Sequence, residues 1–106
     1  MSKQLKGVVI TTANEVTFRD DLRDLTVMQG IVGGWLEAIQ LGDGSTMYLN
    51  EEGRLHGLPF NTIATDVCGI GGRPDLLMQG IVGDVLIVGP PDYEGEDTDL
   101  TERARF

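Results

Sequence analysis

Glycine is the feature that most constrains this chain, because fifteen of its 106 residues are glycine. This is about twice the usual share. The sequence has no Gly-X-Y period, which excludes a collagen-like helix. The glycines instead separate short apolar segments, as in a domain with many tight turns. A chain of this length forms one domain with a modest core.

The segments between the glycines predict short strands. β-Branched residues and period-two alternation place them at residues 5–12, 16–19, 35–41, 46–50 and 84–88. The third and fourth segments flank the turn Gly42-Asp43-Gly44 and so form a hairpin. In the third segment, alternation puts Trp35, Glu37 and Ile39 on one face.

Two helices are predicted between these strands. The first has Asp20 or Asp21 as its N-cap and ends at Gly33-Gly34, and the second begins at Pro59 and ends at Gly69. Their apolar stripes are Leu22, Leu25, Met28 and Ile31 or Val32, then Phe60, Ile63, Ala64 and Val67. We therefore predict an α+β domain, βαββαβ from residue 16 to 88, with both helices on one face of a four- or five-stranded, mostly antiparallel sheet. The N-terminal strand is its hairpin partner, and a pseudo-duplicated arrangement is the alternative.

The net charge of −9 argues against direct binding to nucleic acid or to anionic membranes. One cysteine and one histidine exclude Cys-based zinc or iron–sulfur sites and His-pair metal sites within one chain. No cofactor or metal is predicted. No apolar run approaches the ~20 residues of a membrane span, and the start lacks a signal-peptide core. We expect a cytoplasmic domain at residues 1–91 and a flexible acidic tail at 92–106, with a short helix from Asp99 to Arg105.

One hexapeptide occurs twice. Met-Gln-Gly-Ile-Val-Gly stands at residues 28–33 and again at 78–83, and a strand-like segment follows each copy. The repeat predicts two similar connections that enter adjacent strands. Coincidence in a chain rich in glycine, valine and isoleucine is the alternative.

Three runs together carry a family resemblance. They are Ile-Val-Gly-Gly-Trp-Leu-Glu at 31–37, Asn-Glu-Glu-Gly-Arg-Leu at 50–55 and Gly-Leu-Pro-Phe-Asn at 57–61. In order and spacing they resemble a family of small domains of unknown function from actinobacteria and other bacteria, their phages and their mobile elements. The resemblance covers roughly residues 20–90. It implies a phage or mobile-element origin and no established activity.

The candidate site residues fall into two groups. The first is a polar cluster, with Glu37 as an added member: Asn50, Glu51, Glu52, Arg54, His56 and Asn61. The alternative is structural, with Asn50 bonding its own turn and Asn61 satisfying a helix end. The second group is an aromatic and acidic surface formed by Trp35, Glu37 and Tyr48. If the face of Glu37 is buried, Arg54 is its natural partner, and if the face is open, Trp35 and Glu37 suit an interface.

Two further features have weaker functional interpretations. The glycine-rich loop 69–73 ends at Arg73 and could hold an anion, although a flexible connector is the simpler interpretation. Cys68 is expected to be a small buried apolar side chain.

Three functions follow, in order of preference. The first is a non-enzymatic phage or mobile-element accessory protein that binds a host protein, for host takeover or counter-defence, in the host cytoplasm. The second is sequestration of a small nucleotide defence signal by Asn50, Arg54, Asn61 and Arg73. The third is a hydrolase that uses Glu37 or Glu51. We also expect a homodimer, because a small domain with a strand edge commonly pairs with itself.

Overall fold

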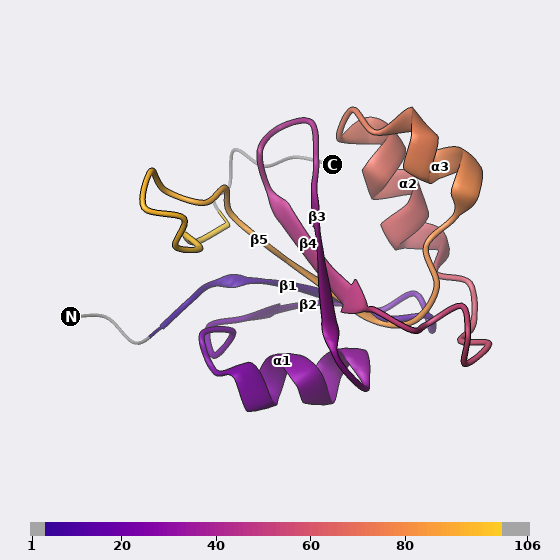
Figure 1. Ribbon diagram of the computed structural model, residues 1–106, viewed down its shortest axis with the longest axis horizontal. Helices are drawn as coiled ribbons and strands as arrows, with labels where there is room; N and C mark the ends of the chain where they lie inside the picture. The colour runs from indigo at the N-terminus through magenta and orange to yellow at the C-terminus, as the bar shows by residue number, and fades with distance from the viewer. Residues whose placement is uncertain (1–3, 101–106) are drawn as a thin grey trace.

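The computed structural model describes residues 4–100. Within them it has the strands and helices of Figure 1, in the order β1 (Gly7–Ile10), β2 (Val16–Arg19), α1 (Leu25–Val32), β3 (Leu36–Gln40), β4 (Thr46–Asn50), α2 (Thr62–Ile70), α3 (Pro74–Gln79) and β5 (Val85–Val88). The longest of these helices has nine residues. A bilayer needs about twenty, so none of the helices in residues 4–100 spans a membrane.

The five strands form one antiparallel sheet in the order β2-β1-β5-β4-β3. β5 therefore lies at the centre of the sheet, between β1 and β4 (Figure 1). From β2 to β5 the elements follow the predicted βαββαβ order, with α3 added, and β1 pairs with β2 as the predicted hairpin. The predicted fold class, a single α+β domain, is confirmed.

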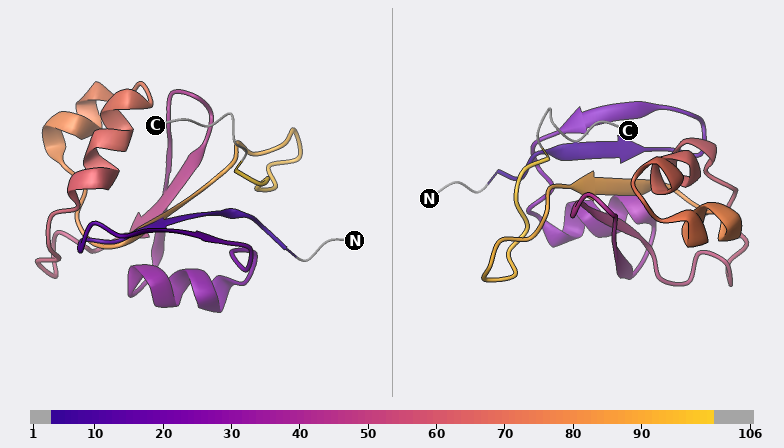
Figure 2. Two further views of the ribbon diagram at one scale, coloured as in Figure 1. Left: turned by 180° about the vertical axis from the view of Figure 1, so that it is seen from behind. Right: turned by 90° about the horizontal axis from the view of Figure 1, so that it is seen from above.

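Helices cover both faces of the sheet. Val85 and Ile87 of β5 belong to the apolar cluster that includes α2 and α3, whereas Leu86 and Val88 belong to the cluster under α1. Figure 2 shows α1 on one side of the sheet and the other two helices on the opposite side. The prediction that two helices share one face is therefore wrong. All four residues of β5 are apolar and buried, so both of its faces need a cover.

Helix α1 begins after Asp24, whose carboxylate accepts a hydrogen bond from the backbone N–H of Thr26 at 2.8 Å. The predicted N-caps, Asp20 and Asp21, are wrong. Asp21 instead accepts a hydrogen bond from the guanidinium of Arg19 at 2.8 Å. The sequence offered three aspartates within five residues, and only the one next to the helix can cap it.

The end of α1 lies where it was predicted from the sequence, whereas its start does not. Gly33 has a left-handed φ of 81° and stops the helix as predicted. Met28 and Val32 of the predicted stripe are buried, and so is Leu22, although Leu22 precedes the helix. Leu25 is exposed, because the helix begins at this residue and its first turn lies at the edge of the core.

Helix α2 begins at Thr62, three residues later than predicted. Asn61 is its N-cap and accepts from the backbone N–H of Ala64 at 3.0 Å. Phe60, predicted within the apolar stripe, lies outside the helix in an isolated bridge with Val82 and is exposed. Pro59 also precedes the helix.

Helix α3 was not predicted. It begins at Pro74, a residue with a φ already suited to the first turn of a helix. Gly69 lies inside α2, which ends at Ile70, so the glycine-rich loop is only the short link 71–73 between two helices.

The two hexapeptide copies have different structures. Residues 28–32 lie in α1, whereas α3 ends at Gln79 and the second copy continues as extended backbone toward β5. β3 and β5 are separated by β4 in the sheet. The prediction of similar connections into adjacent strands is therefore wrong. Only the final glycines agree, since Gly33 and Gly83 both have φ of 81°.

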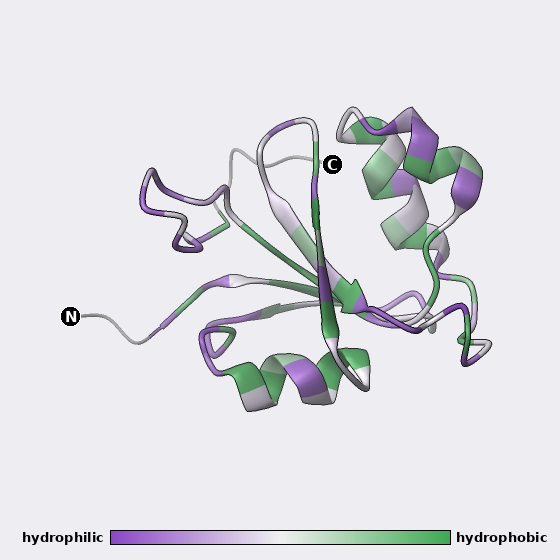
Figure 3. Ribbon diagram, in the orientation of Figure 1, coloured by the Kyte–Doolittle hydropathy of each residue, from purple (hydrophilic) through white to green (hydrophobic). Residues whose placement is uncertain are grey.

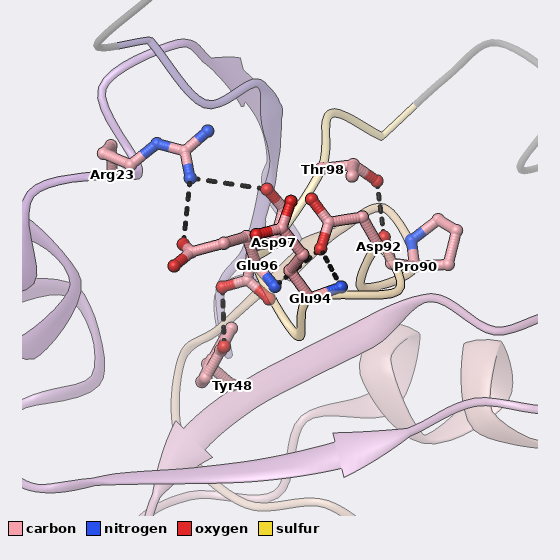
Figure 4. Close-up of polar contacts among 8 residues, drawn as sticks. All are labelled: Arg23, Tyr48, Pro90, Asp92, Glu94, Glu96, Asp97 and Thr98. Atoms are coloured by element: carbon pink, nitrogen blue, oxygen red, sulfur yellow. Dashed lines mark hydrogen bonds and ion pairs between the residues drawn. The ribbon is translucent and has the colours of Figure 1, made fainter.

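The acidic segment from Asp92 to Leu100 lies against the domain. The Tyr48 hydroxyl donates a hydrogen bond to the Asp97 carboxylate at 2.6 Å, and Arg23 lies 4.0 Å from the Glu96 carboxylate (Figure 4). Figure 3 shows this segment as mostly hydrophilic and β5 as hydrophobic. Polar contacts therefore hold most of the segment against the domain, and Leu100 at its end packs against the apolar core.

Its last described residues also pair with the start of the chain. The backbone N–H of Leu100 donates to the carbonyl of Lys6 at 2.9 Å, and that of Lys6 donates to the Asp99 carboxylate at 2.8 Å. The expected helix from Asp99 to Arg105 lies outside the described residues beyond Leu100. The expected flexibility of the tail stays a prediction, which amide hydrogen exchange would test.

Candidate functional site

A cleft of about 430 Å³ opens at the β3 edge of the sheet, on the side covered by α2 and α3. Strands β3 and β4, the turn after β4, and the end of α3 all contribute to it. Its lining residues are Glu37, Ile39, Leu49, Asn50, Glu51, Glu52, Gly53, Arg54, Leu55, Leu76, Gln79, Gly80, Ile81 and Val82. Five of the ten predicted site residues are among them: Glu37, Asn50, Glu51, Glu52 and Arg54.

Asn50 shapes the cleft from within. Its side-chain oxygen accepts from the backbone N–H of Glu52 at 2.8 Å, and its amide nitrogen donates to the carbonyl of Val32 at 3.2 Å. The residue is buried and both ends of its amide are occupied by the chain itself. Asn50 therefore fixes the turn after β4 and joins it to the end of α1, as the structural alternative proposed.

Arg54 joins the turn to α3. Its guanidinium donates to the carbonyl of Gln79 at 3.0 Å and also to the carbonyl of Gly80. No ion pair joins it to Glu37 among residues 4–100. Glu37 is exposed, so its carboxylate remains hydrated and needs no such partner.

The rim of the cleft is acidic. The carboxylates of Glu37, Glu51 and Glu52 are all exposed on it. Glu52 lies 3.8 Å from the ring of His56, one helical turn along the chain, and this contact is an ion pair only when the histidine is protonated. His56 itself is exposed and does not line the cleft. Three carboxylates beside one guanidinium that already bonds carbonyl groups give this rim a negative potential.

Trp35 directly precedes β3 and is 68% exposed. It lies outside the core, next to the strand that carries Glu37. Of the two alternatives for this face, the open one is therefore correct, and Trp35 and Glu37 are both accessible.

Tyr48 does not belong to that surface. In the β3–β4 pairing Glu37 lies opposite Leu49, whereas Tyr48 lies opposite Ala38, so Tyr48 and Glu37 point to opposite faces. The predicted Trp35–Glu37–Tyr48 surface is wrong for this reason. Burial and the neighbouring Asp97 carboxylate raise the pKa of the Tyr48 hydroxyl well above its usual range, so it donates a hydrogen bond and stays neutral (Figure 4).

Asn61 is also a structural residue. It is fully buried, and its amide nitrogen donates to the carbonyls of Ile10 at 3.0 Å and Gly83 at 2.9 Å. Together with its bond to the N–H of Ala64, this uses both ends of the side chain. Asn61 does not line the cleft.

Arg73 is held away from the cleft. Its guanidinium makes a two-pronged contact with the Asp75 carboxylate, at 3.0 and 2.9 Å, and donates to the carbonyl of Gln40 at 2.7 Å. The carboxylate raises the pKa of Arg73, and the guanidinium lowers that of Asp75. Because the Asp75 carboxylate already neutralises this guanidinium, it repels a second anion placed beside Arg73.

The outer edge of β3 is open. The backbone N–H of Glu51 donates to the carbonyl of Trp35, and that of Leu41 donates to the carbonyl of Ser45. The backbone N–H and C=O groups of the odd-numbered residues along β3 therefore point toward β4. Because bonded and non-bonded positions alternate in an antiparallel pair, the backbone groups of residues 36, 38 and 40 point away from the sheet. The bond from Arg73 to the carbonyl of Gln40 agrees with this alternation.

The part of the cleft formed by α3 was not predicted from the sequence. Leu76, Gln79 and Gly80 line it, and the two carbonyls that bind Arg54 belong to this helix end. Pro74 was the signal, since a proline followed by an acidic residue commonly opens a helix.

Cys68 is buried, which raises the pKa of its thiol to about 11 and keeps it protonated, in keeping with the expected apolar role. Within residues 4–100, histidine, cysteine and carboxylate side chains form no group of three that could hold a metal ion.

The fold and the cleft define a class of protein: a small α+β domain with helices on both faces of an antiparallel sheet and an acidic cleft at one sheet edge. The chain belongs to the family described as a domain of unknown function, DUF3846, whose model matches residues 5–106. No curated protein and no solved structure matches the chain. The family match extends beyond the resemblance at residues 20–90 and includes the acidic C-terminal segment.

Proposed function

We propose that this protein acts by binding another protein, without catalysis, at the β3 edge and the adjoining cleft. The observation that carries the proposal is Trp35, exposed directly before an edge strand whose outward backbone groups are open. Natural proteins normally protect such edges, and tryptophan is enriched among residues that dominate binding energy.

The partner we propose offers an extended segment with lysine or arginine side chains. Its backbone pairs with the outward groups of Leu36 and Ala38, as in strand addition. Its basic side chains reach the carboxylates of Glu37, Glu51 and Glu52 at the cleft. Opposite charges increase the rate of association and fix the register of the added strand.

The family resemblance supports the finer proposal of a phage or mobile-element accessory protein that binds a host protein in the bacterial cytoplasm. The nucleotide hypothesis has less support, because Asn50, Asn61 and Arg73 spend their donors within the chain. The hydrolase hypothesis relies on Glu37 or Glu51, and among residues 4–100 neither carboxylate forms an ion pair that would orient it for acid–base catalysis.

The test is affinity capture of bacterial host proteins and small molecules by three forms of the tagged chain. These are the original sequence, the double variant Trp35→Ala/Glu37→Lys, and Tyr93→Ala. Tyr93 is the matched control, because it is a fully accessible aromatic residue on a different segment. We expect a stoichiometric protein that the double variant loses and the control retains.

Tryptophan fluorescence then places the purified partner. Trp35 is the single tryptophan of the chain, so burial of this residue shifts the emission to shorter wavelength. A partner that leaves the emission unchanged, or that the double variant still captures, would refute this site. A released nucleotide without any protein would favour sequestration instead.

A further inference from the structure

The opposite edge of the sheet, strand β2, is also open. The backbone N–H of Thr11 donates to the carbonyl of Glu15 at 2.9 Å, which makes this a bonded pair at the end of the β1–β2 hairpin. By the alternation of antiparallel strands, Thr17 also faces β1, and the backbone groups of Val16 and Phe18 point outward.

The side chains of this edge are unusually apolar for their exposure. Phe18 is 81% exposed and Val16 is 50% exposed. In the pairing with β1, Phe18 lies opposite Val8 and Val16 opposite Ile10, so both lie on the face that α2 and α3 cover farther along the sheet. All four residues of β2 are exposed.

The sequence of β2 is complementary to itself in an antiparallel arrangement. With Thr17 on a two-fold axis, Val16 lies opposite Phe18 of the second copy, and both are positions whose backbone groups point outward. Each such pair exchanges both of its backbone hydrogen bonds. The apolar side chains meet on one face, which stabilises cross-strand pairs.

The same register also matches charges. Glu15 of one copy lies opposite Arg19 of the other, on both sides of the axis, where it joins the Asp21 carboxylate that the Arg19 guanidinium already bonds within its own copy. Each copy carries a net charge of −9, so general repulsion opposes association and an attractive pair at this place offsets part of it. At β3, by contrast, Arg73 already occupies the carbonyl of Gln40.

We propose that two copies of this chain pair through their β2 strands, antiparallel and with Thr17 on the two-fold axis, to form one continuous sheet. The inference is independent of the proposed function, because it uses the opposite edge of the sheet and leaves β3 free in both copies. A four-residue strand gives a small contact, so the dimer dissociates on dilution, and added salt favours it by screening the net charge.

A cysteine at the axis gives the sharpest test. In Thr17→Cys the two thiols would face each other at a non-bonded pair, where Cα atoms are roughly 4.5 Å apart and a disulfide fits. The only native cysteine, Cys68, is buried. Ala38→Cys is the control, since residue 38 is the exposed central position of β3, the other edge strand.

We expect mild oxidation to convert Thr17→Cys into a disulfide-linked dimer while Ala38→Cys stays monomeric. Sedimentation equilibrium measures the dissociation constant of the reversible dimer, without a disulfide. Phe18→Lys should weaken the dimer roughly tenfold or more, and Tyr93→Lys should leave it unchanged. Equal cross-linking of both cysteine variants, or an unlinked Thr17→Cys with an unchanged circular dichroism spectrum, would overturn the proposal.

Discussion

The two copies of Met-Gln-Gly-Ile-Val-Gly have the same residues and different backbones. In the first copy Met28 is a buried residue of α1, and the helix continues to Val32. In the second, Met78 is 88% exposed and the helix ends one residue later, at Gln79. The comparison teaches that these six residues permit both structures, and that the contacts around each copy decide between them.

The middle glycine is where the two backbones diverge. Gly30 continues the helix, whereas Gly80 has a φ of 84°. After Gly80 the N–H of Ile81 donates to the Thr65 hydroxyl at 2.8 Å, and the carbonyl of Ile81 accepts from Asn61 at 2.8 Å. These bonds and the burial of Ile81 stabilise the extended form.

A buried asparagine holds the end of each copy. Asn50 donates to the carbonyl of Val32, and Asn61 donates to that of Gly83. Asn61 additionally bonds Ile10 and caps α2. The second copy therefore depends on tertiary contacts more heavily than the first.

The largest expected effect tests that dependence. Asn61→Ala removes the N-cap of α2 and leaves the carbonyls of Ile10 and Gly83 without this donor, so we expect a loss of about 3 kcal/mol in the free energy of unfolding. Asn50→Ala is the matched variant, with a loss of about 1.5 kcal/mol. Urea denaturation followed by circular dichroism measures both. An equal or larger loss for Asn50→Ala would break the comparison.

Gly80→Ala tests the divergence itself. Residue 80 has a left-handed φ, which strains any residue with a side chain. In addition, a Cβ built at this position lies 2.7 Å from the ring of Phe60. We expect a loss of about 2 kcal/mol in the free energy of unfolding. In the Phe60→Ala background the ring is gone but the φ remains, so part of the loss should persist. A neutral Gly80→Ala would show that this backbone is not strained by a side chain.

Gly30→Ala gives the smallest effect and the opposite sign. No atom lies within 4 Å of a Cβ built at Gly30, and the residue is exposed within the helix. We expect a gain of about 0.8 kcal/mol, because alanine is the better helix former. A rise in the urea midpoint at constant slope would confirm it, and a fall would mean that the first copy also needs its glycine.

Much of the fold was predictable because local signals agreed with each other. Alternating apolar residues placed the strands, Gly42-Asp43-Gly44 placed the β3–β4 hairpin, and Gly33 stopped α1. The helix starts were less predictable, since several residues could cap each helix and only tertiary structure selects among them. The division of helices between two faces follows from the burial of β5 on both sides.

The candidate site was predicted only in part. The turn from Asn50 to Arg54 lies at the cleft with Glu37, because all of them belong to one hairpin and its following turn. Asn61 and Arg73 carry the same polar groups, but their partners come from distant segments, Ile10 and Gln40. The residue type alone does not tell whether a side-chain hydrogen-bond donor bonds a backbone carbonyl of the same chain or is available to a ligand.

The central place of β5 has a consequence for biosynthesis. Within the sheet, β5 is the strand that pairs with both the β1–β2 hairpin and the β3–β4 hairpin. A nascent chain can form each hairpin early, but it cannot join them until Val88 has left the ribosome. A message cut short before that residue gives two hairpins without the strand that pairs them into one sheet, and their apolar faces are then open to the quality-control proteases of the cell.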